Sequence, residues 1–125
     1  MPVESRTRIT LFLPAPSTLG RYLLADAVLS ELVQICGGVT ASLEVPSVFM
    51  GRWFDASAQQ TREDANVMVL ADAPVPPERP GLVEYLETLK LRCQQDFVQD
   101  VIWMTIHGVG RIAANDYVRW AIDHE

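Results

Sequence analysis

Hydrophobic periodicity alternates along this chain between the two-residue repeat of a strand and the three-to-four-residue repeat of a helix. The segments are, in order, 8–13 (strand), 18–36 (helix), 39–54 (strand), 66–71 (strand), 81–99 (helix) and 101–109 (strand). This β-α-β-β-α-β order is the split-βαβ or ferredoxin-like plan of an α+β protein. Right-handed crossovers put both helices on one face of a four-stranded sheet. With 125 residues the chain has room for one such domain, 1–125.

The boundaries of these elements follow from capping and turn residues. Ser17 or Thr18 can cap the first helix, and Gly37-Gly38 ends it because the position after a helix favours positive φ. Pro46 and Gly51 predict a bend in the second strand, at an edge of the sheet. The polar segment 55–64 is expected to be the loop of a long hairpin. A short helix is expected over 115–124, with flexible ends at 1–7 and 123–125.

Composition excludes several classes of protein. Ten Lys and Arg against sixteen Asp and Glu give a net charge of -6, so a basic nucleic-acid-binding surface is not expected. Two cysteines, Cys36 and Cys93, exclude a disulfide framework and a CxxC zinc site. No apolar stretch is long enough to span a bilayer and no secretory leader follows the polar N-terminus. We therefore expect a cytoplasmic protein without membrane insertion.

One face of the predicted sheet lacks a cover. The helices cover the face with Ile9, Leu11 and Leu13, so Phe12 and Trp103, with Met68 or Leu70, lie on the other face. A face this apolar is unfavourable in water. The pattern therefore predicts an oligomer that buries the open face.

Four short motifs occur in an order found in a known family. They are Cys36 with Gly38-Val39-Thr40, then Ser47-Val48-Phe49, then Glu63 and Asp64 with Val67-Met68-Val69-Leu70, and last Asn115-Asp116-Tyr117-Val118-x-Trp120-Ala121-Ile122. In these motifs the chain resembles the CutA family of the PII-like superfamily, whose passages read Ala-Ala-Cys-Val-Asn, Ser-x-Tyr, Glu-x-x-Val/Leu-x-Ile and Asn-x-x-Tyr-Leu-x-Trp-Ile. The last motif is the most specific of the four.

The chain also departs from the CutA pattern. The family's His-Pro-Tyr-Glu/Asp-Val-Pro is replaced by 94–99 (QQDFVQ), its Lys-Thr after the third strand by Asp72-Ala73, and its second-strand tryptophan is displaced to Trp53. The resemblance implies a homotrimer of ferredoxin-like subunits whose long hairpin reaches over a neighbour. It does not carry over copper tolerance.

His107 and the nearby carboxylates are the candidates for a metal site. Three copies of His107 in a trimer would converge on an axis, but one histidine supplies fewer donors than the three or four of a tight site. A buried or interfacial histidine is the competing interpretation. Asp96 and Asp100 lie four residues apart, which is typical of a solvated helix face.

The segment 107–111 (HGVGR) predicts a ligand-binding turn. Backbone amides of Gly108 and Gly110, with the Arg111 guanidinium, can cradle an anion such as phosphate, although an ordinary turn explains the glycines equally well. PII-like proteins bind nucleotides in clefts between subunits, so the resemblance supports this interpretation. Arg52 and Arg62 are the further candidates to line such a cleft.

The residues favour a binding protein over an enzyme. No Ser/His/Asp set, P-loop or Rossmann motif is present. The main hypothesis is a non-catalytic trimeric sensor or adaptor that binds a nucleotide, an anion or a protein partner, with the 55–64 loop ordering on binding. One alternative is a divalent-metal (copper) protein of the CutA type. The other is a small enzyme with a sheet-face pocket around Trp103 and His107.

Overall fold

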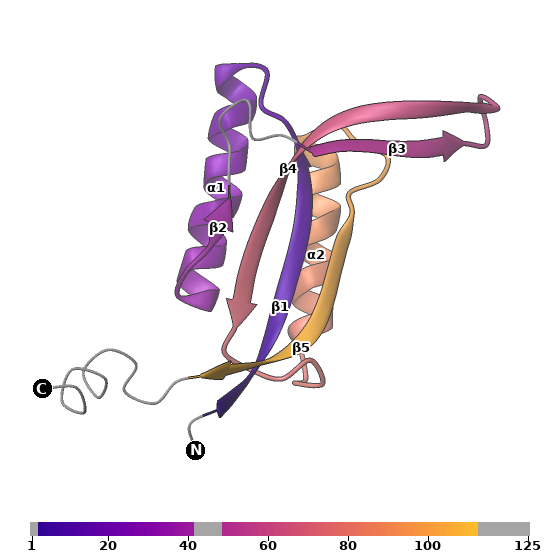
Figure 1. The fold of residues 1–125 in the computed structure, drawn as a ribbon. Coiled ribbons are helices and arrows are strands. Elements are labelled where there is room, and N and C mark those ends of the chain that lie inside the picture. Colours follow the sequence, from indigo (N-terminus) through magenta and orange to yellow (C-terminus); the bar gives the residue numbers. More distant parts are fainter. Residues whose placement is uncertain (1–2, 42–48, 113–125) are drawn as a thin grey trace, which may run out of the picture.

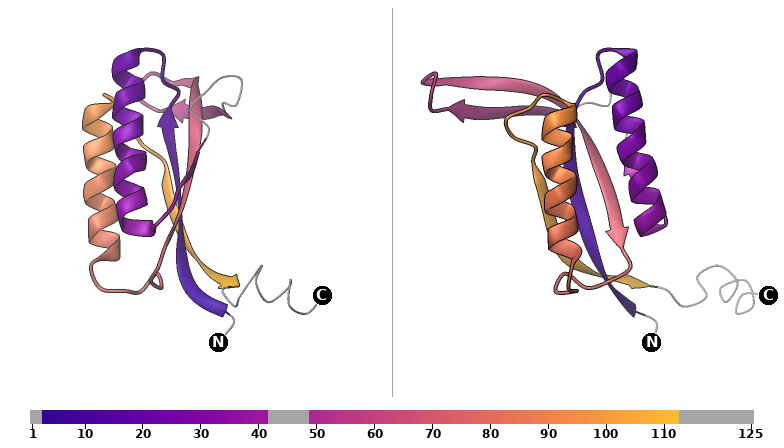
Figure 2. Two further views of the ribbon diagram at one scale, coloured as in Figure 1. Left: turned by 90° about the vertical axis from the view of Figure 1, so that its left-hand side faces the viewer. Right: turned by 180° about the vertical axis from the view of Figure 1, so that it is seen from behind.

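The computed structural model of the chain describes residues 3–41 and 49–112. An antiparallel sheet of five strands is covered on one face by two helices, α1 and α2 (Figures 1 and 2). The elements are, in chain order, β1 (Val3–Pro14), α1 (Leu19–Cys36), β2 (Thr40–Ala41), β3 (Phe49–Asp55), β4 (Gln60–Ala73), α2 (Leu82–Asp96) and β5 (Met104–Ile112). The predictions of an α+β fold and of two helices on one sheet face are confirmed. The predicted C-terminal helix and Pro46 lie outside the described residues.

Strand order is β2-β4-β1-β5, with β3 paired to the first half of β4. The predicted second strand is therefore two strands, β2 and β3, which gives five where four were expected. Seven residues separate Ala41 from Phe49, but only two separate their partners Val69 and Asn66, so the pairing register shifts by five between β2 and β3. Residues 3–7, expected to be a flexible end, lie in β1 and pair with β5.

The ends of α1 agree with the capping residues. The Thr18 hydroxyl accepts a hydrogen bond from the Arg21 amide at 3.2 Å, which satisfies a donor that the first turn leaves free. Gly37 follows Cys36 with φ 84°, and its amide donates to the Val33 carbonyl at 2.8 Å. The helix therefore begins and ends where the sequence predicts.

The core lies between the helices and the inner face of the sheet. Alternate side chains of β1 and β4 meet stripes of both helices there. The buried apolar residues are Ile9, Leu11, Leu13, Ala25, Val28, Leu32, Cys36, Val67, Val69, Ala71, Ala73, Leu82, Leu86, Leu89, Cys93, Phe97 and Ile102. Burial raises the pKa of the Cys93 thiol to about 11, so this cysteine is a neutral core side chain at physiological pH.

A contact between side chains joins the two helices outside the core. Glu31 on α1 accepts hydrogen bonds from the Tyr85 hydroxyl and, at 2.6 and 2.7 Å, from Arg92 Nη2 on α2. Burial raises the pKa of the Glu31 carboxyl, but these hydrogen bonds outweigh it and the net direction is down. The Glu31 carboxylate therefore links α1 to α2 by side-chain hydrogen bonds.

The paired segment 49–66, called the arm below, projects away from the rest of the sheet (Figure 1). Its turn is much shorter than the predicted 55–64 loop, because β3 runs to Asp55 and β4 begins at Gln60. Asp55 Oδ1 accepts from the amides of Ser57 and Ala58 and from the Ser57 hydroxyl, at 3.1, 3.2 and 2.7 Å. The turn is therefore built by its own hydrogen bonds, and 60–64 is strand.

Within the described residues, no helix is long and apolar enough to cross a membrane.

Candidate functional site

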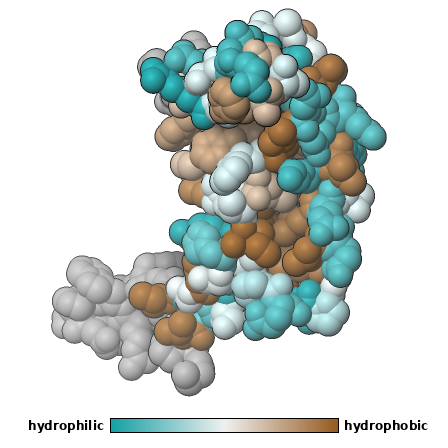
Figure 3. Space-filling view, turned by 90° about the vertical axis from the view of Figure 1, so that its right-hand side faces the viewer, coloured by the Kyte–Doolittle hydropathy of each residue, from teal (hydrophilic) through white to brown (hydrophobic). Residues whose placement is uncertain are grey.

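A hollow of about 710 Å³ lies where the arm meets the connection between α2 and β5. Three segments line it: the end of β1, the two strands of the arm (β3 and the first half of β4), and the residues just before β5. The lining residues are Phe12, Pro14, Phe49, Met50, Gly51, Arg52, Trp53, Asp64, Asn66, Val98, Gln99, Asp100, Val101, Ile102 and Trp103. In Figure 3 the arm is at the top and hydrophobic side chains gather below it.

Four aromatic side chains form much of this hollow. The Phe12 and Phe49 rings pack edge to face, with centroids 6.1 Å apart and planes at 80°, which fixes the arm against the open face of the sheet. Trp103 extends β5 beside Phe12, whose amide donates to the Trp103 carbonyl at 3.0 Å. Trp103 is 63% exposed and Trp53 is 40% exposed. Both indoles therefore have surface free for a ligand.

Asp64 fixes the orientation of one indole. The Trp53 Nε1–H donates to Asp64 Oδ2 at 2.6 Å, across the two strands of the arm. A charge-assisted hydrogen bond of this length restricts rotation of the ring. The carboxylate and the aromatic surface are thus held together at one wall of the hollow.

The charge of the lining is negative. Arg52, its one cation, pairs with Glu63, which lies outside the lining, at 2.9 Å between Nε and Oε1. Asp64 and Asp100 form no ion pair with any residue of the described ranges. Aromatic faces and unpaired carboxylates both attract cations. The lining is therefore suited to an organic cation.

The wall opposite the arm begins with a strained residue. Val98 has φ 53°, a left-handed conformation that is rare for a β-branched side chain. Its amide donates to Gln95 O at 3.2 Å, and the Gln99 amide donates to Gln94 O at 2.9 Å. The Gln94 side-chain amide reaches the Asp100 carbonyl at 2.5 Å. These contacts turn the chain sharply out of α2 and end it three residues earlier than predicted.

The predicted site residues are not brought together. Of the six candidates for ligand binding, Arg52 alone lines the hollow. Arg62 lies near the arm turn, paired with Asp55 at 2.7 Å. His107, Gly108, Gly110 and Arg111 lie in β5, paired with β1. Both glycines are inside a strand instead of the predicted turn, because β5 continues to Ile112. The role of these six residues in ligand binding stays a prediction.

Sequence reasoning missed most of the hollow. Asp100 was interpreted as part of a solvated helix face and Asp64 only as part of a family motif, and Phe49, Trp53 and Asn66 received no role in a site. Three of its members were singled out: Arg52 as a candidate for ligand binding, and Phe12 and Trp103 through the apolar open face. The signal for the rest is the number of aromatic side chains on the short strand β3, since a two-stranded arm has little core to bury them.

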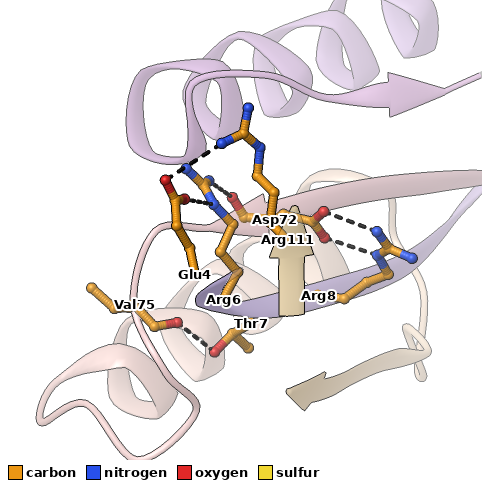
Figure 4. Close-up of polar contacts among 7 residues, drawn as sticks. All are labelled: Glu4, Arg6, Thr7, Arg8, Asp72, Val75 and Arg111. Atoms are coloured by element: carbon orange, nitrogen blue, oxygen red, sulfur yellow. Dashed lines mark hydrogen bonds and ion pairs between the residues drawn. The ribbon is translucent and has the colours of Figure 1, made fainter. Parts of the chain in front are cut away.

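A polar cluster occupies the other end of the open face (Figure 4). Arg8 donates to both carboxylate oxygens of Asp72, at 2.8 and 2.9 Å. Arg6 binds Glu4 at 3.1 Å, and Arg111 approaches the same carboxylate at 3.5 Å. The hydroxyl of Thr7, on the core side of β1, donates to the Val75 carbonyl at 2.8 Å. The Arg111 guanidinium, predicted to bind an anion, is thus engaged by a carboxylate of the protein.

Within a single chain the described residues give His107 no metal-binding cluster, and the convergence of three copies of His107 stays a prediction. The described residues contain no group of three His, Cys, Asp or Glu side chains that can hold a metal ion. His107 is exposed and lies in register with Arg8, which is paired with Asp72.

Asp72→Asn is expected to lower the free energy of unfolding at pH 7 by up to about 1 kcal/mol, as is usual for a half-exposed ion pair. The hydrogen bond from Arg8 holds the pKa of the Asp72 carboxyl below its ordinary value. A carboxyl with a lowered folded pKa stabilises the protein above its unfolded pKa, near 4, and loses this effect as the pH falls through the folded value. Urea unfolding at pH 7, 4 and 2.5 tests this.

The two proteins are therefore expected to converge in stability at low pH. Asp26→Asn, on exposed α1 surface without an ion pair among the described residues, is the matched control and is expected to show no pH-dependent difference. A difference between Asp72→Asn and wild type that persists at pH 2.5 would contradict the ion-pair explanation.

Comparison with known proteins finds similarity in fold and none in sequence. No family model matches the chain, and no curated protein matches it in sequence. Among solved structures it is similar to a phage SAM lyase in complex with S-methyl-5′-thioadenosine, with a TM-score of 0.59 and 11% identity over 86% of this chain and 90% of that chain.

This likeness corrects the predicted family. The chain resembles the SAM lyase structure and not a CutA or PII protein, so that assignment is wrong. The expectations of a non-catalytic sensor and of a chain that is not an enzyme are withdrawn with it, because the similar structure is that of an enzyme. The copper alternative loses the same basis. The alternative of a small enzyme with a pocket at Trp103 is the one that the comparison favours, although His107 does not line the hollow. The chain has the fold of the phage SAM lyase.

Proposed function

We propose that the chain is an enzyme that binds S-adenosylmethionine in the hollow and cleaves it, with release of S-methyl-5′-thioadenosine. One observation carries the proposal: the hollow combines four aromatic side chains with two carboxylates that form no ion pair within residues 3–41 and 49–112, on a fold like that of a SAM lyase. S-adenosylmethionine has a planar base, a sulfonium and an α-ammonium group. Each of these is a natural partner for such a lining.

The electrostatics of the whole chain favour this ligand. S-adenosylmethionine carries one net positive charge, and the chain carries a formal charge of -6. A negatively charged protein raises the local concentration of a cationic substrate. The α-ammonium group keeps its charge from substrate to product. Asp64 and Asp100 therefore strengthen binding of substrate and transition state alike.

The bond to be broken joins the sulfonium sulfur to Cγ of the methionine part. The electron pair of that bond stays on sulfur, and the neutral thioether S-methyl-5′-thioadenosine leaves without needing a proton. The substrate's own carboxylate attacks Cγ and closes a five-membered ring, so the second product is protonated homoserine lactone. Atoms and charge balance, and no other reactant is consumed.

The protein's part in this step is to exclude water and to orient the substrate. The attack joins a carboxylate to a carbon that bears a positive sulfur, so opposite charges cancel as the bond forms. Water stabilises the separated charges more than the transition state, and a water-poor aromatic wall removes this disadvantage. Holding the carboxylate in line with the breaking bond adds the advantage of proximity. Trp53 and Trp103 are the side chains in position to form this wall.

The test is to incubate the protein with S-adenosylmethionine and to measure both products by liquid chromatography with mass detection. We expect S-methyl-5′-thioadenosine and homoserine lactone in equal amounts, at a rate proportional to protein concentration. Heat-denatured protein and buffer alone measure spontaneous decay of the substrate. Decay no faster than in these controls would overturn the proposal.

We also propose that copies of this chain cover the open sheet face, as its apolar composition predicted. Phe49, Met50, Val101 and Trp103 in the lining of the hollow remain exposed in the single chain, so a second copy is expected to pack next to the hollow and leave its opening free. A trimer, and a protein partner at 55–64, stay predictions. Light scattering on the sample used for the activity test gives the mass of the assembly.

A further inference from the structure

Gly51 stands in the middle of β3, where its backbone does not require glycine. It is not among the glycines of positive φ, which are Gly37 and Gly81 in the described part of the chain. It pairs with Asp64 in an unbroken ladder, so it does not bend the strand as predicted. Glycine in the interior of a strand weakens it, and often marks close approach of a ligand. The reason for Gly51 therefore lies in the space beside it.

That space is part of the hollow. Alternation along β3 places Phe49, Gly51 and Trp53 on one side of the arm. This is the side that meets the sheet, because the Phe49 ring packs on Phe12. The absent side chain of Gly51 thus leaves a slot between two aromatic residues that both line the hollow.

The far side of the slot is polar. A Cβ atom on Gly51 would lie 3.0 Å from Asn66 Nδ2 and 3.7 Å from the Asp64 carbonyl oxygen. Asn66 Nδ2 donates to that carbonyl at 3.3 Å, and no hydrogen bond from the described residues reaches its Oδ1. The Asn66 carboxamide therefore has an acceptor free, and its second N–H is available.

We infer that the slot over Gly51 holds the adenine base of the ligand and that the Asn66 carboxamide recognises the edge of this base. This inference rests on the proposed function. Residue 51 itself places no side chain between Phe49 and Trp53, and the Asn66 carboxamide borders this space, so that a flat base has an amide at its edge. Adenine presents an N6 donor beside the N7 acceptor, and an asparagine amide pairs with both. Gly51 and Asn66 thus determine which nucleoside enters the hollow.

Gly51→Ala tests the slot. The added methyl group occupies it and presses on Asn66, so we expect the dissociation constant for S-methyl-5′-thioadenosine to rise about tenfold or more by calorimetry. Gly20→Ala is the control, since Gly20 lies in α1, outside the lining, and is not among the glycines of positive φ. Its Cβ would make an ordinary contact of 3.9 Å with the Thr18 hydroxyl oxygen. We expect its affinity to equal that of wild type, and circular dichroism confirms that both variants fold.

Asn66→Ala tests the recognition of the base. Wild type is expected to bind S-methyl-5′-thioinosine about tenfold more weakly than S-methyl-5′-thioadenosine, because hypoxanthine has an acceptor in place of the N6 donor. In Asn66→Ala the two ligands are expected to bind equally.

The outcomes separate the two proposals. The inference about the adenine slot is overturned if Gly51→Ala binds S-methyl-5′-thioadenosine as tightly as wild type does. It is also overturned if Asn66→Ala still discriminates between the two nucleosides. In either case, cleavage of S-adenosylmethionine by the wild-type protein would still support the proposed function. Absence of both cleavage and nucleoside binding in wild type would overturn both.

Discussion

Trp103→Ala is expected to lower kcat/KM for cleavage of S-adenosylmethionine about 100-fold, because stacking and desolvation by one aromatic wall are worth about 2–3 kcal/mol. Part of this loss is expected in kcat. The indole excludes water from the sulfonium and the attacking carboxylate, an effect that grows toward the transition state. Trp103→Phe keeps an aromatic face and is expected to retain most of the activity. Initial rates over a range of substrate concentrations measure both constants.

The Trp103 variant is a clean test because the side chain is not part of the core. Trp103 is 63% exposed, so removal leaves no cavity and the melting temperature is expected to stay close to that of wild type. Wild-type kcat/KM in Trp103→Ala would show that the chemistry takes place elsewhere.

Asp64→Asn gives the contrasting result. The asparagine Oδ1 still accepts the hydrogen bond from Trp53, so the variant removes the charge and keeps the geometry. A loss of about 1 kcal/mol in attraction for the α-ammonium raises KM about fivefold, with kcat nearly constant. A fall in kcat with KM unchanged would instead assign Asp64 to the chemical step.

Local patterns predicted most of the fold. The alternation Ile9, Leu11, Leu13 identified the buried face of β1, and the stripe Leu82, Leu86, Leu89, Cys93, Phe97 is buried throughout. Thr18 and Gly37 marked the ends of α1. These features depend on neighbours within one or two turns, which is why sequence alone reveals them.

Features that depend on contacts between distant segments were missed. The polar stretch 60–64 is strand because it pairs with β3 and not because of its own composition. Likewise Asp64, Trp53 and Trp103 share a hollow only after the arm has packed on the sheet through Phe12 and Phe49. Sequence periodicity contains no information on such approach of distant elements.

The family error has a similar origin. The CutA motifs were short, and two of them, at Cys36 and at Val67-Met68-Val69-Leu70, coincide with the end of a helix and a buried strand. Many α+β proteins need a small residue at the end of such a helix and β-branched or long apolar residues in such a buried strand. Such motifs therefore record common packing requirements and not shared chemistry.

Phe97→Ala is expected to lower the free energy of unfolding by about 3–5 kcal/mol, the usual cost of removing a fully buried phenyl ring. Phe97 is 0% exposed and closes α2, where its amide donates to the Cys93 carbonyl at 2.9 Å. The next residues form the wall of the hollow, so the ring also anchors that wall to the core. The cavity that its removal leaves is expected to loosen both the end of α2 and the wall of the hollow. Urea unfolding gives the change in stability, provided that the dependence of the free energy of unfolding on urea concentration has the same slope in both proteins.

Val98→Gly, one position further along the chain, is the matched control, and its free energy of unfolding is expected to change in the opposite direction. Val98 is 80% exposed and adopts φ 53°, which glycine accepts without strain. Relief of about 1–3 kcal/mol of strain is offset by the flexibility that glycine adds to the unfolded chain, so we expect a net gain of up to about 1 kcal/mol. A loss below 1 kcal/mol for Phe97→Ala would contradict its place in the core. A loss in Val98→Gly would show that the valine side chain stabilises the wall of the hollow by contacts that outweigh its strain.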